Sequence, residues 1–145
     1  MKILELTHRY PPALGGVEGH VEAIAAGLHA RGHGVEIATT DVERDRPFRR
    51  LGPLERPDPW PVRRHRAVRL FPAPHGLGIW APGMAVDLFR SRPDVVHAHA
   101  FGMAPTWLAT VRRRRDPTPL VVETHADRGR GTAGWRLYAR LVARG

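Results

Sequence analysis

The chain has 145 residues, the size of about one domain, and its lack of cysteine excludes disulfides, thiolate catalysis and cysteine-bound zinc. With 42% hydrophobic residues it is not compositionally disordered, and no apolar run approaches the roughly 18 residues of a membrane span. The formal net charge is +9, and almost all the basic residues are arginines. This excess fits either an anionic partner or a general preference for arginine codons.

The first forty residues predict a strand, a helix and a second strand. Residues 2–7 are rich in apolar side chains, and a loop over His8–Gly16 follows them. From Val17 the apolar residues recur on one helical face, and Gly32 is placed to end that helix. Residues 35–40 form the second strand, and such a strand–helix–strand unit makes the two strands parallel.

The remaining elements alternate in the same way. Residues 41–61 are rich in Arg, Asp, Pro and Gly and predict an exposed loop, and Val62–Phe71 predicts one or two short strands. Further helices are expected at residues 84–92, 106–115 and 135–144, and further strands at residues 94–99 and 120–124. The apolar run at residues 120–122 is typical of a central strand.

Alternating strands and helices predict an α/β fold, a Rossmann-like parallel sheet with helices on both faces. Ligands of such folds bind outside the carboxyl ends of the strands. Three loops follow strands in this way, at residues 8–17, 97–101 and 125–134. We therefore expect the functional residues there.

The first of these loops carries a glycine pair, Gly15-Gly16, directly before the predicted helix. Glycines at this position let backbone amides approach a phosphate, and the helix dipole favours an anion. Val17 and Glu18 continue the same candidate substrate-binding segment. The pair also fits an ordinary tight turn, and it is neither a dinucleotide fingerprint nor a P-loop.

Three histidines follow the fourth and fifth strands of the predicted sheet. His97 and His99 alternate along one strand and so share a face, while His125 follows the next strand. A neutral imidazole there can bind a hydroxyl or orient an acceptor. His97 also fits a core histidine, and His125 a loop residue without a role. Zinc is geometrically possible, but no neighbouring carboxylate completes a familiar pattern, so we expect no metal.

Three separated segments carry distinct motifs. Residues 11–18 have the pattern Pro-Pro-x-x-Gly-Gly-x-Glu, and a helix ending at residues 28–33 follows them. Residues 92–99 have the sequence Arg-Pro-Asp-Val-Val-His-Ala-His, and residues 121–125 have the sequence Val-Val-Glu-Thr-His. Together these segments resemble family-4 glycosyltransferases of GT-B architecture, in which the last two are similar to the fourth and fifth strands. The matches keep the family's order and cover almost the whole chain.

The resemblance implies that residues 1–145 form one N-terminal, acceptor-side domain, half of a GT-B fold, whose C-terminal donor-binding partner domain lies outside this sequence in cis or in trans. The implied reaction transfers a hexosyl group with retention from a UDP- or GDP-hexose to a lipid, saccharide or small-molecule acceptor. It needs no cofactor and no divalent metal, and we expect no activity from the domain alone.

The resemblance also implies roles for individual residues. Gly15 and Gly16 lie at the interdomain cleft, with the Gly16 amide near the donor diphosphate or the acceptor. His125 faces the reaction centre as the catalytic candidate, and His97 and His99 lie at the cleft edge.

Two basic clusters, residues 63–66 and 112–115, fit either solvated surface or attraction to anionic lipid. With Trp60, Phe71 and Trp80 near the first cluster, we expect a cytoplasmic protein that can contact the inner membrane face.

Two other classes of protein remain open. A non-catalytic basic module would bind nucleic acid or membrane, although we expect no nucleic acid partner. A dinucleotide-binding oxidoreductase would use Asp41, just past the second strand, as its ribose-binding acid.

Overall fold

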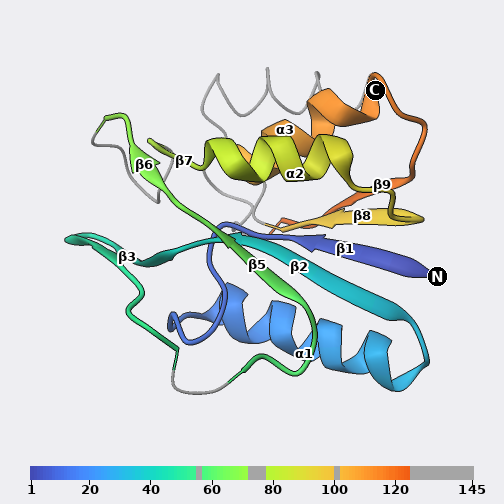
Figure 1. The fold of residues 1–145 in the computed structure, drawn as a ribbon, viewed down its shortest axis with the longest axis horizontal. Coiled ribbons are helices and arrows are strands. Elements are labelled where there is room, and N and C mark those ends of the chain that lie inside the picture. The colour runs from blue at the N-terminus through green and yellow to red at the C-terminus, as the bar shows by residue number, and fades with distance from the viewer. Residues whose placement is uncertain (55–56, 72–77, 100–101, 125–145) are drawn as a thin grey trace.

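A five-stranded parallel sheet forms the centre of the molecule, in the strand order β5-β2-β1-β8-β9 (Figure 1). The computed structural model describes residues 1–54, 57–71, 78–99 and 102–124. The strands of the sheet are β1 (Lys2–Leu6), β2 (Gly34–Thr40), β5 (Val62–His65), β8 (Val95–Ala98) and β9 (Leu120–Val122). Neighbouring strands are parallel throughout, so their carboxyl ends share one edge.

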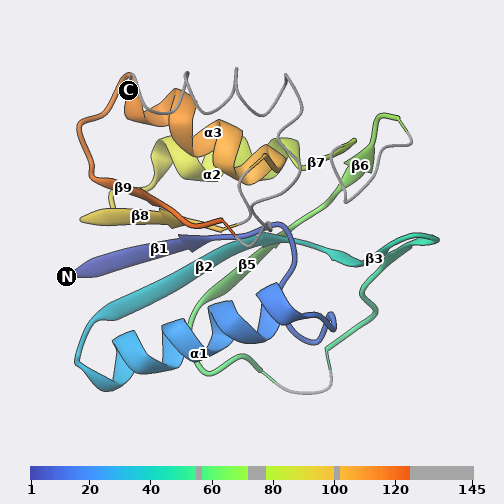
Figure 2. The same ribbon diagram turned by 180° about the vertical axis from the view of Figure 1, so that it is seen from behind.

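Helices cover both faces of this sheet. Helix α1 (Gly16–Ala30) packs on one face, and α2 (Pro82–Arg90) and α3 (Ala104–Arg113) pack on the other (Figures 1 and 2). The predicted Rossmann-like α/β fold is therefore confirmed. None of the helices in the described ranges is long and apolar enough to cross a membrane.

Helix α1 ends where the sequence predicts. Gly32 has a left-handed backbone with a φ of 81°, and its amide donates to the His29 carbonyl at 2.9 Å. The amide of His33 donates back to the Leu28 carbonyl at 3.2 Å. These bonds use carbonyls that the last helical turn leaves free, and a residue with a Cβ rarely adopts such a φ.

Helices α2 and α3 begin two residues earlier than predicted. Pro82 is the first residue of α2, and Pro105 lies in the first turn of α3. Proline suits these positions because the first helical amides have no intrahelical acceptor. The prolines mark helix starts here, and the prediction placed both starts just after them.

The larger apolar core lies between the sheet and the α2–α3 layer. Strand side chains that point to this side meet Met84 and Leu88 of α2 and Ala109 of α3. The strand members of this core are Leu4, Leu6, Ala38, Val96 and Ala98. A smaller core, with Val21 of α1 packed over Val35 and Ile37 of β2, lies on the other face.

The expected loop at residues 41–61 is partly wrong, because β3 (Val42–Asp45) and β4 (Phe48–Arg50) form an antiparallel hairpin inside it. Val42 is fully buried, with Phe48 packed against its cluster, and these two are the hairpin's only apolar side chains. Exposed charges on the other face obscure the alternation that marks a strand. A second short hairpin joins β6 (Val68–Arg69) to β7 (Ile79–Trp80).

The expectation of a central position for residues 120–122 is also wrong. In the described part of the chain β9 pairs only with β8 and lies at the sheet edge. Val121 is 50% exposed, so a run of three apolar residues is too short to distinguish an edge strand from a central one. The predicted helix at 135–144 and the loop at 125–134 lie outside the described residues.

Candidate active site

The loop between β1 and α1 is closed by an internal ion pair. Glu18 is buried in the first turn of α1, and its Oε1 lies 2.7 Å from Nε of Arg9. Its side chain folds back over Gly15, where an added Cβ would stand 2.1 Å from Oε2. Gly15 has an extended backbone with a φ of 165°, so packing rather than backbone conformation favours glycine there. The Glu18 carboxylate thus holds the loop together.

Gly16 differs from its neighbour. It is exposed, and an added Cβ would meet no atom within 4 Å. Gly16 and half-buried Val17 open helix α1, where the first amides have no intrahelical acceptor and the dipole is positive. This helix start has the features of an anion-binding position.

The same loop is anchored from β5 and the segment before it. Trp60 donates its indole N–H to the Tyr10 hydroxyl at 3.0 Å, and Arg64 donates to Asp58 at 2.6 Å and to the Pro11 carbonyl. Burial raises the pKa of Tyr10 to about 12, so its hydroxyl stays protonated. A pocket of about 550 Å³, lined in part by Pro11, adjoins the loop.

The basic cluster at residues 63–66 is mostly engaged inside the fold. Arg63 pairs with Glu36 at 2.9 Å and with Asp87 at 3.2 Å, and His65 also lies 3.2 Å from Asp87. Arg64 is bound to Asp58, and of the four residues only Arg66 is exposed. Arg63, Arg64 and His65 are therefore neither freely solvated nor available to lipid, because carboxylates of the same fold engage them.

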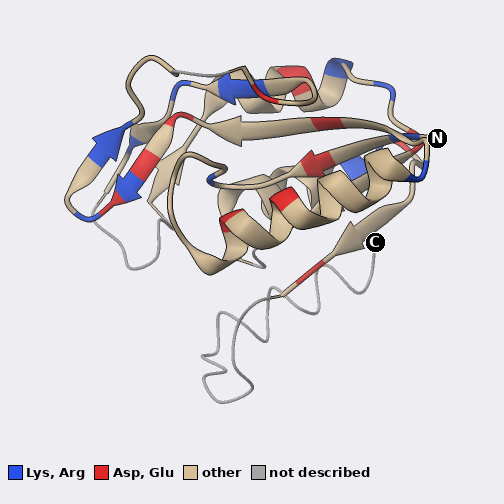
Figure 3. Cartoon of the chain, turned by 90° about the horizontal axis from the view of Figure 1, so that it is seen from below, with Lys and Arg blue, Asp and Glu red and all other residues tan. Residues whose placement is uncertain are grey.

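Acidic groups also balance the hairpin arginines. Arg49 pairs with Glu43 across the β3–β4 hairpin at 2.8 Å, and Figure 3 shows basic and acidic segments side by side there. Asp41 accepts from the Ala67 amide at 2.8 Å and lies 3.3 Å from Arg50. The carboxylate considered for ribose binding thus holds two strand connections together.

At the carboxyl end of β8 the two histidines of the His-x-His pattern lie against a buried carboxylate. Glu5 of β1 is directly opposite His97 in the strand register. Its Oε2 lies 3.1 Å from Nδ1 of His97 and 2.6 Å from Nε2 of His99. The two imidazole centroids are 4.1 Å apart. Glu5 and His99 are fully buried, whereas the His97 side chain is 16% exposed.

A second carboxylate approaches the same imidazoles from β9. Oε2 of Glu123 lies 3.1 Å from Nδ1 of His99 and 3.7 Å from Nε2 of His97. Its Oε1 lies 2.9 Å from Nε2 of His20 on α1. The expectation that no carboxylate lies near the His-x-His pattern is therefore wrong, because the fold brings two of them there from distant parts of the sequence.

The contacts in this cluster favour a negative charge on Glu5 and a positive charge on His97. Burial raises the pKa of Glu5, but hydrogen bonds from His97 and His99 outweigh it and hold that pKa below its ordinary value. Burial lowers the pKa of His97, and here the hydrogen bond and the charge of Glu5 reverse the effect, so its pKa is raised. Glu5 is accordingly a carboxylate, and His97 carries a proton more readily than a free histidine does.

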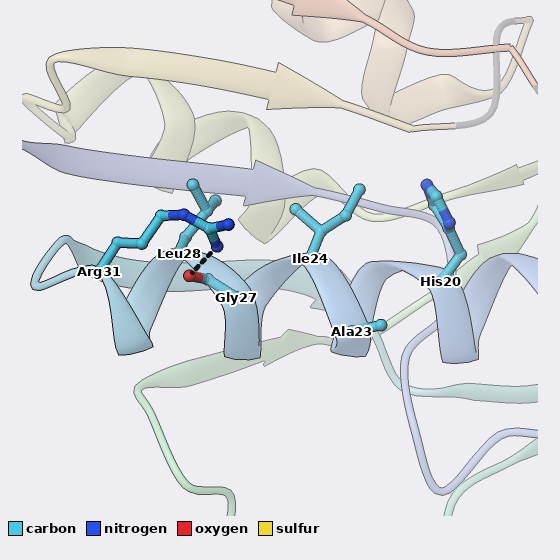
Figure 4. Close-up of a pocket in the computed structure, with 6 residues that line it drawn as sticks. All are labelled: His20, Ala23, Ile24, Gly27, Leu28 and Arg31. Carbon is cyan, nitrogen blue, oxygen red and sulfur yellow. Dashed lines mark hydrogen bonds between the residues drawn. The ribbon is translucent and has the colours of Figure 1, made fainter.

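Helix α1 is tied to this cluster at its own N-terminal end. His20 lies one turn beyond Gly16, contacts Glu123, and stacks edge-on to His99 with centroids 6.3 Å apart. His20 also borders a shallow pocket of about 390 Å³ along α1, lined further by Ala23, Ile24, Gly27, Leu28 and Arg31 (Figure 4). The start of α1 and the ends of β8 and β9 therefore meet at one edge.

Most predicted site residues are at that edge, and several others there were missed. Gly15, Gly16, Val17 and Glu18 open α1, and His97 and His99 end β8, whereas His125 lies outside the described residues. The missed residues are Glu5, Arg9, His20 and Glu123. One signal was available for Glu5, since a carboxylate between two leucines in an apolar strand is unusual.

A parallel sheet with helices on both faces defines a Rossmann-like domain, and its polar side chains gather at the carboxyl edge, where ligands bind in folds of this class. The family model for Glycosyltransferase Family 4 matches residues 14–145, and the chain belongs to this family. No individual curated protein matches the sequence.

Proposed function

We propose that this chain is the acceptor-side domain of a retaining glycosyltransferase that uses a UDP- or GDP-hexose. It would pass the hexosyl group to a lipid, saccharide or small-molecule acceptor in the cytoplasm. The proposal includes a separate donor-binding domain, in cis or in trans, with which this domain completes a GT-B enzyme. Family membership over residues 14–145 supports the reaction class.

One contact carries the proposal for the position of the site. Nε2 of His20 lies 2.9 Å from Oε1 of Glu123 and so joins the start of α1 to the end of β9. This link supports a site in which the glycine pair, one helical turn before His20, lies near the strand end that precedes His125 in the sequence. A site built from Gly16, the His-x-His pair and His125 requires such proximity.

The chemistry of sugar transfer gives these groups distinct roles. The transition state resembles an oxocarbenium ion, and a nucleoside diphosphate departs with its negative charge. Backbone amides of Gly16 and Val17 would stabilise that charge at the positive end of α1. His97, whose side chain is partly exposed, would hold a hydroxyl group at the cleft edge, with buried His99 packed against it. His125 would face the transferred sugar.

Titrations and a reconstituted assay test this proposal. The chain alone is expected to bind UDP- and GDP-hexoses weakly or not at all, because most donor contacts belong to the other domain. With a family-4 donor-binding domain supplied as a fusion, we expect transfer of labelled hexose. Gly16→Val should lower turnover at least tenfold, whereas the exposed-helix variant Val86→Ala should not. Micromolar NAD binding or sequence-selective DNA binding by the chain would contradict the proposal.

We also propose contact between the β6 segment and the anionic inner face of a membrane. Arg66, Val68, Arg69, Leu70 and Phe71 are all exposed, which joins basic to apolar side chains in one short stretch. Cosedimentation with anionic phosphatidylglycerol vesicles should exceed that with neutral vesicles and should fall in a Leu70→Ser variant. Equal binding to both kinds of vesicle, or none, would contradict this contact.

A further inference from the structure

The buried carboxylate of Glu5 is only partly satisfied by its neighbours. Glu5 is fully buried on the central strand β1, and its Oε2 faces two imidazole nitrogens. Its Oε1 is buried without a hydrogen-bond partner among the residues that the structure describes. A buried polar atom normally has a partner, because removing it from water without one is costly. This oxygen therefore points to a ligand.

The atoms around Glu5 suit a small cation. Glu5 and the two histidines each offer one ligand atom, and these atoms all lie within 4.8 Å of one another. Zinc binds imidazole nitrogen and carboxylate oxygen at about 2.0–2.2 Å, which places tetrahedral ligand atoms about 3.3 Å apart. The present separations of 3.1 Å to His97 and 2.6 Å to His99 need only small side-chain movements to reach that spacing.

The surroundings resemble the outer shell of a metal site. A histidine that binds a metal through one ring nitrogen usually donates its other N–H to a carboxylate. His99 directs Nε2 toward Glu5, and its Nδ1 lies 3.1 Å from Oε2 of Glu123. In the tautomer in which Nδ1–H donates to Glu123, the Nε2 lone pair of His99 would face the Glu5 carboxylate and could bind a metal there. Glu123 is itself held by His20 at 2.9 Å.

The backbone gives these groups a fixed relative position. Glu5, His97 and Val121 lie in register on three adjacent parallel strands, and Glu123 directly follows the last of them. Ligands on strands are held more firmly than ligands on loops. The His97 side chain is 16% exposed, so solvent reaches one side of the cluster.

We propose that Glu5, His97 and His99 form a binding site for one divalent transition-metal ion of the zinc class, with Glu123 orienting His99. Two imidazoles and one carboxylate are ligands that zinc accepts readily. The ion would bind the Glu5 carboxylate, whose Oε1 has no hydrogen-bond partner among the described residues, and would bridge β1 to the end of β8. The proposal assigns the ion no part in sugar transfer, although the site shares the His-x-His pair with the proposed acceptor edge, and zinc binding can be measured without donor or acceptor.

Zinc titration of the untagged 145-residue chain tests the site. Competition with a chromogenic chelator should show one tight equivalent per chain. Glu5→Gln and His99→Gln should each weaken zinc binding at least tenfold, and Glu123→Gln should weaken it about 10- to 100-fold through the lost orientation of His99. His33→Gln is the matched control, since His33 follows the opposite end of α1. It should leave the tight equivalent unchanged.

Two results with these variants would overturn the site. The first is a wild-type zinc affinity no higher than that of Glu5→Gln. The second is a loss of zinc affinity in His33→Gln as large as that in the ligand variants. If Glu5→Gln fails to fold by circular dichroism, His97→Gln, at a partly exposed position, serves instead. Cobalt provides a readout without any variant, because a site of this kind gives visible absorption bands typical of four-coordinate cobalt. Their absence at one equivalent would likewise reject the proposal.

Discussion

The two faces of the central sheet differ sharply along the same strands. On β1 and β8, the side chains directed to α2 and α3 are apolar, as with Leu6 and Val96. The alternate side chains, directed to the α1 side, include Glu5 and His97. Because successive side chains of a strand point to opposite faces, a one-residue step separates the apolar core from the polar cluster.

The two faces of the sheet therefore differ in kind, with apolar packing on one and polar, titratable side chains on the other. Central parallel strands are normally apolar on both faces, because helices cover both. A local departure from that rule is expected at a functional site, where the sequence gives up packing for reactive groups. The α2–α3 face then carries most of the apolar core, and the α1 face carries the polar cluster. Four substitutions test how far this division holds.

The largest effect is expected on the apolar face. Leu6 is fully buried in the α2–α3 core, so Leu6→Ala should lower the free energy of unfolding by about 3 kcal/mol through lost burial and a residual cavity. Urea denaturation measures this value. Val86→Ala on exposed α2 surface is the control and should change it by less than about 0.5 kcal/mol. A loss at Leu6 as small as the control would show that this face is not the stabilising one.

The next effect concerns a charged group in the helical layer. Arg112 is buried on α3, where it donates to the Leu88 carbonyl at 3.0 Å and to Asp116 at 2.9 Å. Arg112→Met should cost about 2 kcal/mol, since it leaves these acceptors without their charged donor. The exposed neighbour variant Arg114→Met should cost less than about 0.5 kcal/mol. If Arg112→Met and Arg114→Met cost the same in thermal or urea unfolding, Arg112 would be no more buried or bonded than the exposed arginines beside it.

A smaller effect is expected where α1 begins. Gly15→Ala must displace the Glu18 carboxylate from its place beside Arg9, and we expect a loss of about 1 kcal/mol. Gly16→Ala meets no atom within 4 Å and should stay within about 0.5 kcal/mol of the wild type. The variant Glu18→Ala removes the carboxylate that clashes. In that background Gly15→Ala should therefore cost less stability than it does in the wild type. Matching losses at both glycines would contradict the distinct roles assigned to them.

The smallest expected effect is a pH dependence of stability that comes from His65, beside Asp87 of α2. Burial lowers the pKa of His65 below its ordinary value of 6.5, and Asp87 offsets this only in part. The unfolded chain then binds a proton at His65 more readily than the folded chain does. The stability that neutral His65 contributes is therefore fully present above pH 6.5 and is lost as the pH falls through the lowered pKa. Between about pH 7.5 and about pH 5 the wild type should lose more stability than His65→Gln. Parallel curves in urea titrations would contradict the lowered pKa.

The sequence predicted the sheet well because its signals are local. The apolar periodicity from Val17 and the left-handed position of Gly32 define α1 without reference to the rest of the molecule. Alternation of strands and helices then gives the parallel sheet. The β3–β4 hairpin was missed because Val42 and Phe48 are buried by partners distant in sequence, among them Ala67 and Ile79.

The site was predicted only in part, for a related reason. The glycine pair and the His-x-His pattern are short motifs that can be read directly. The carboxylates that complete the cluster come from positions 92 and 26 residues away from His97, at Glu5 and Glu123. Only the pairing of β1 and β9 with β8 brings them together, so composition and spacing carry no sign of that contact.

The position of β1 at the middle of the sheet has a consequence for how the chain is synthesised. Its pairing with β2 can form as soon as Thr40 leaves the ribosome, but its other partner, β8, ends at Ala98. For the several seconds that translation of the intervening segment takes, one edge of the strand is an open template for foreign strands. Glu5 places a charge within this otherwise apolar strand, and we expect that charge to disfavour pairing of the nascent chain with foreign strands.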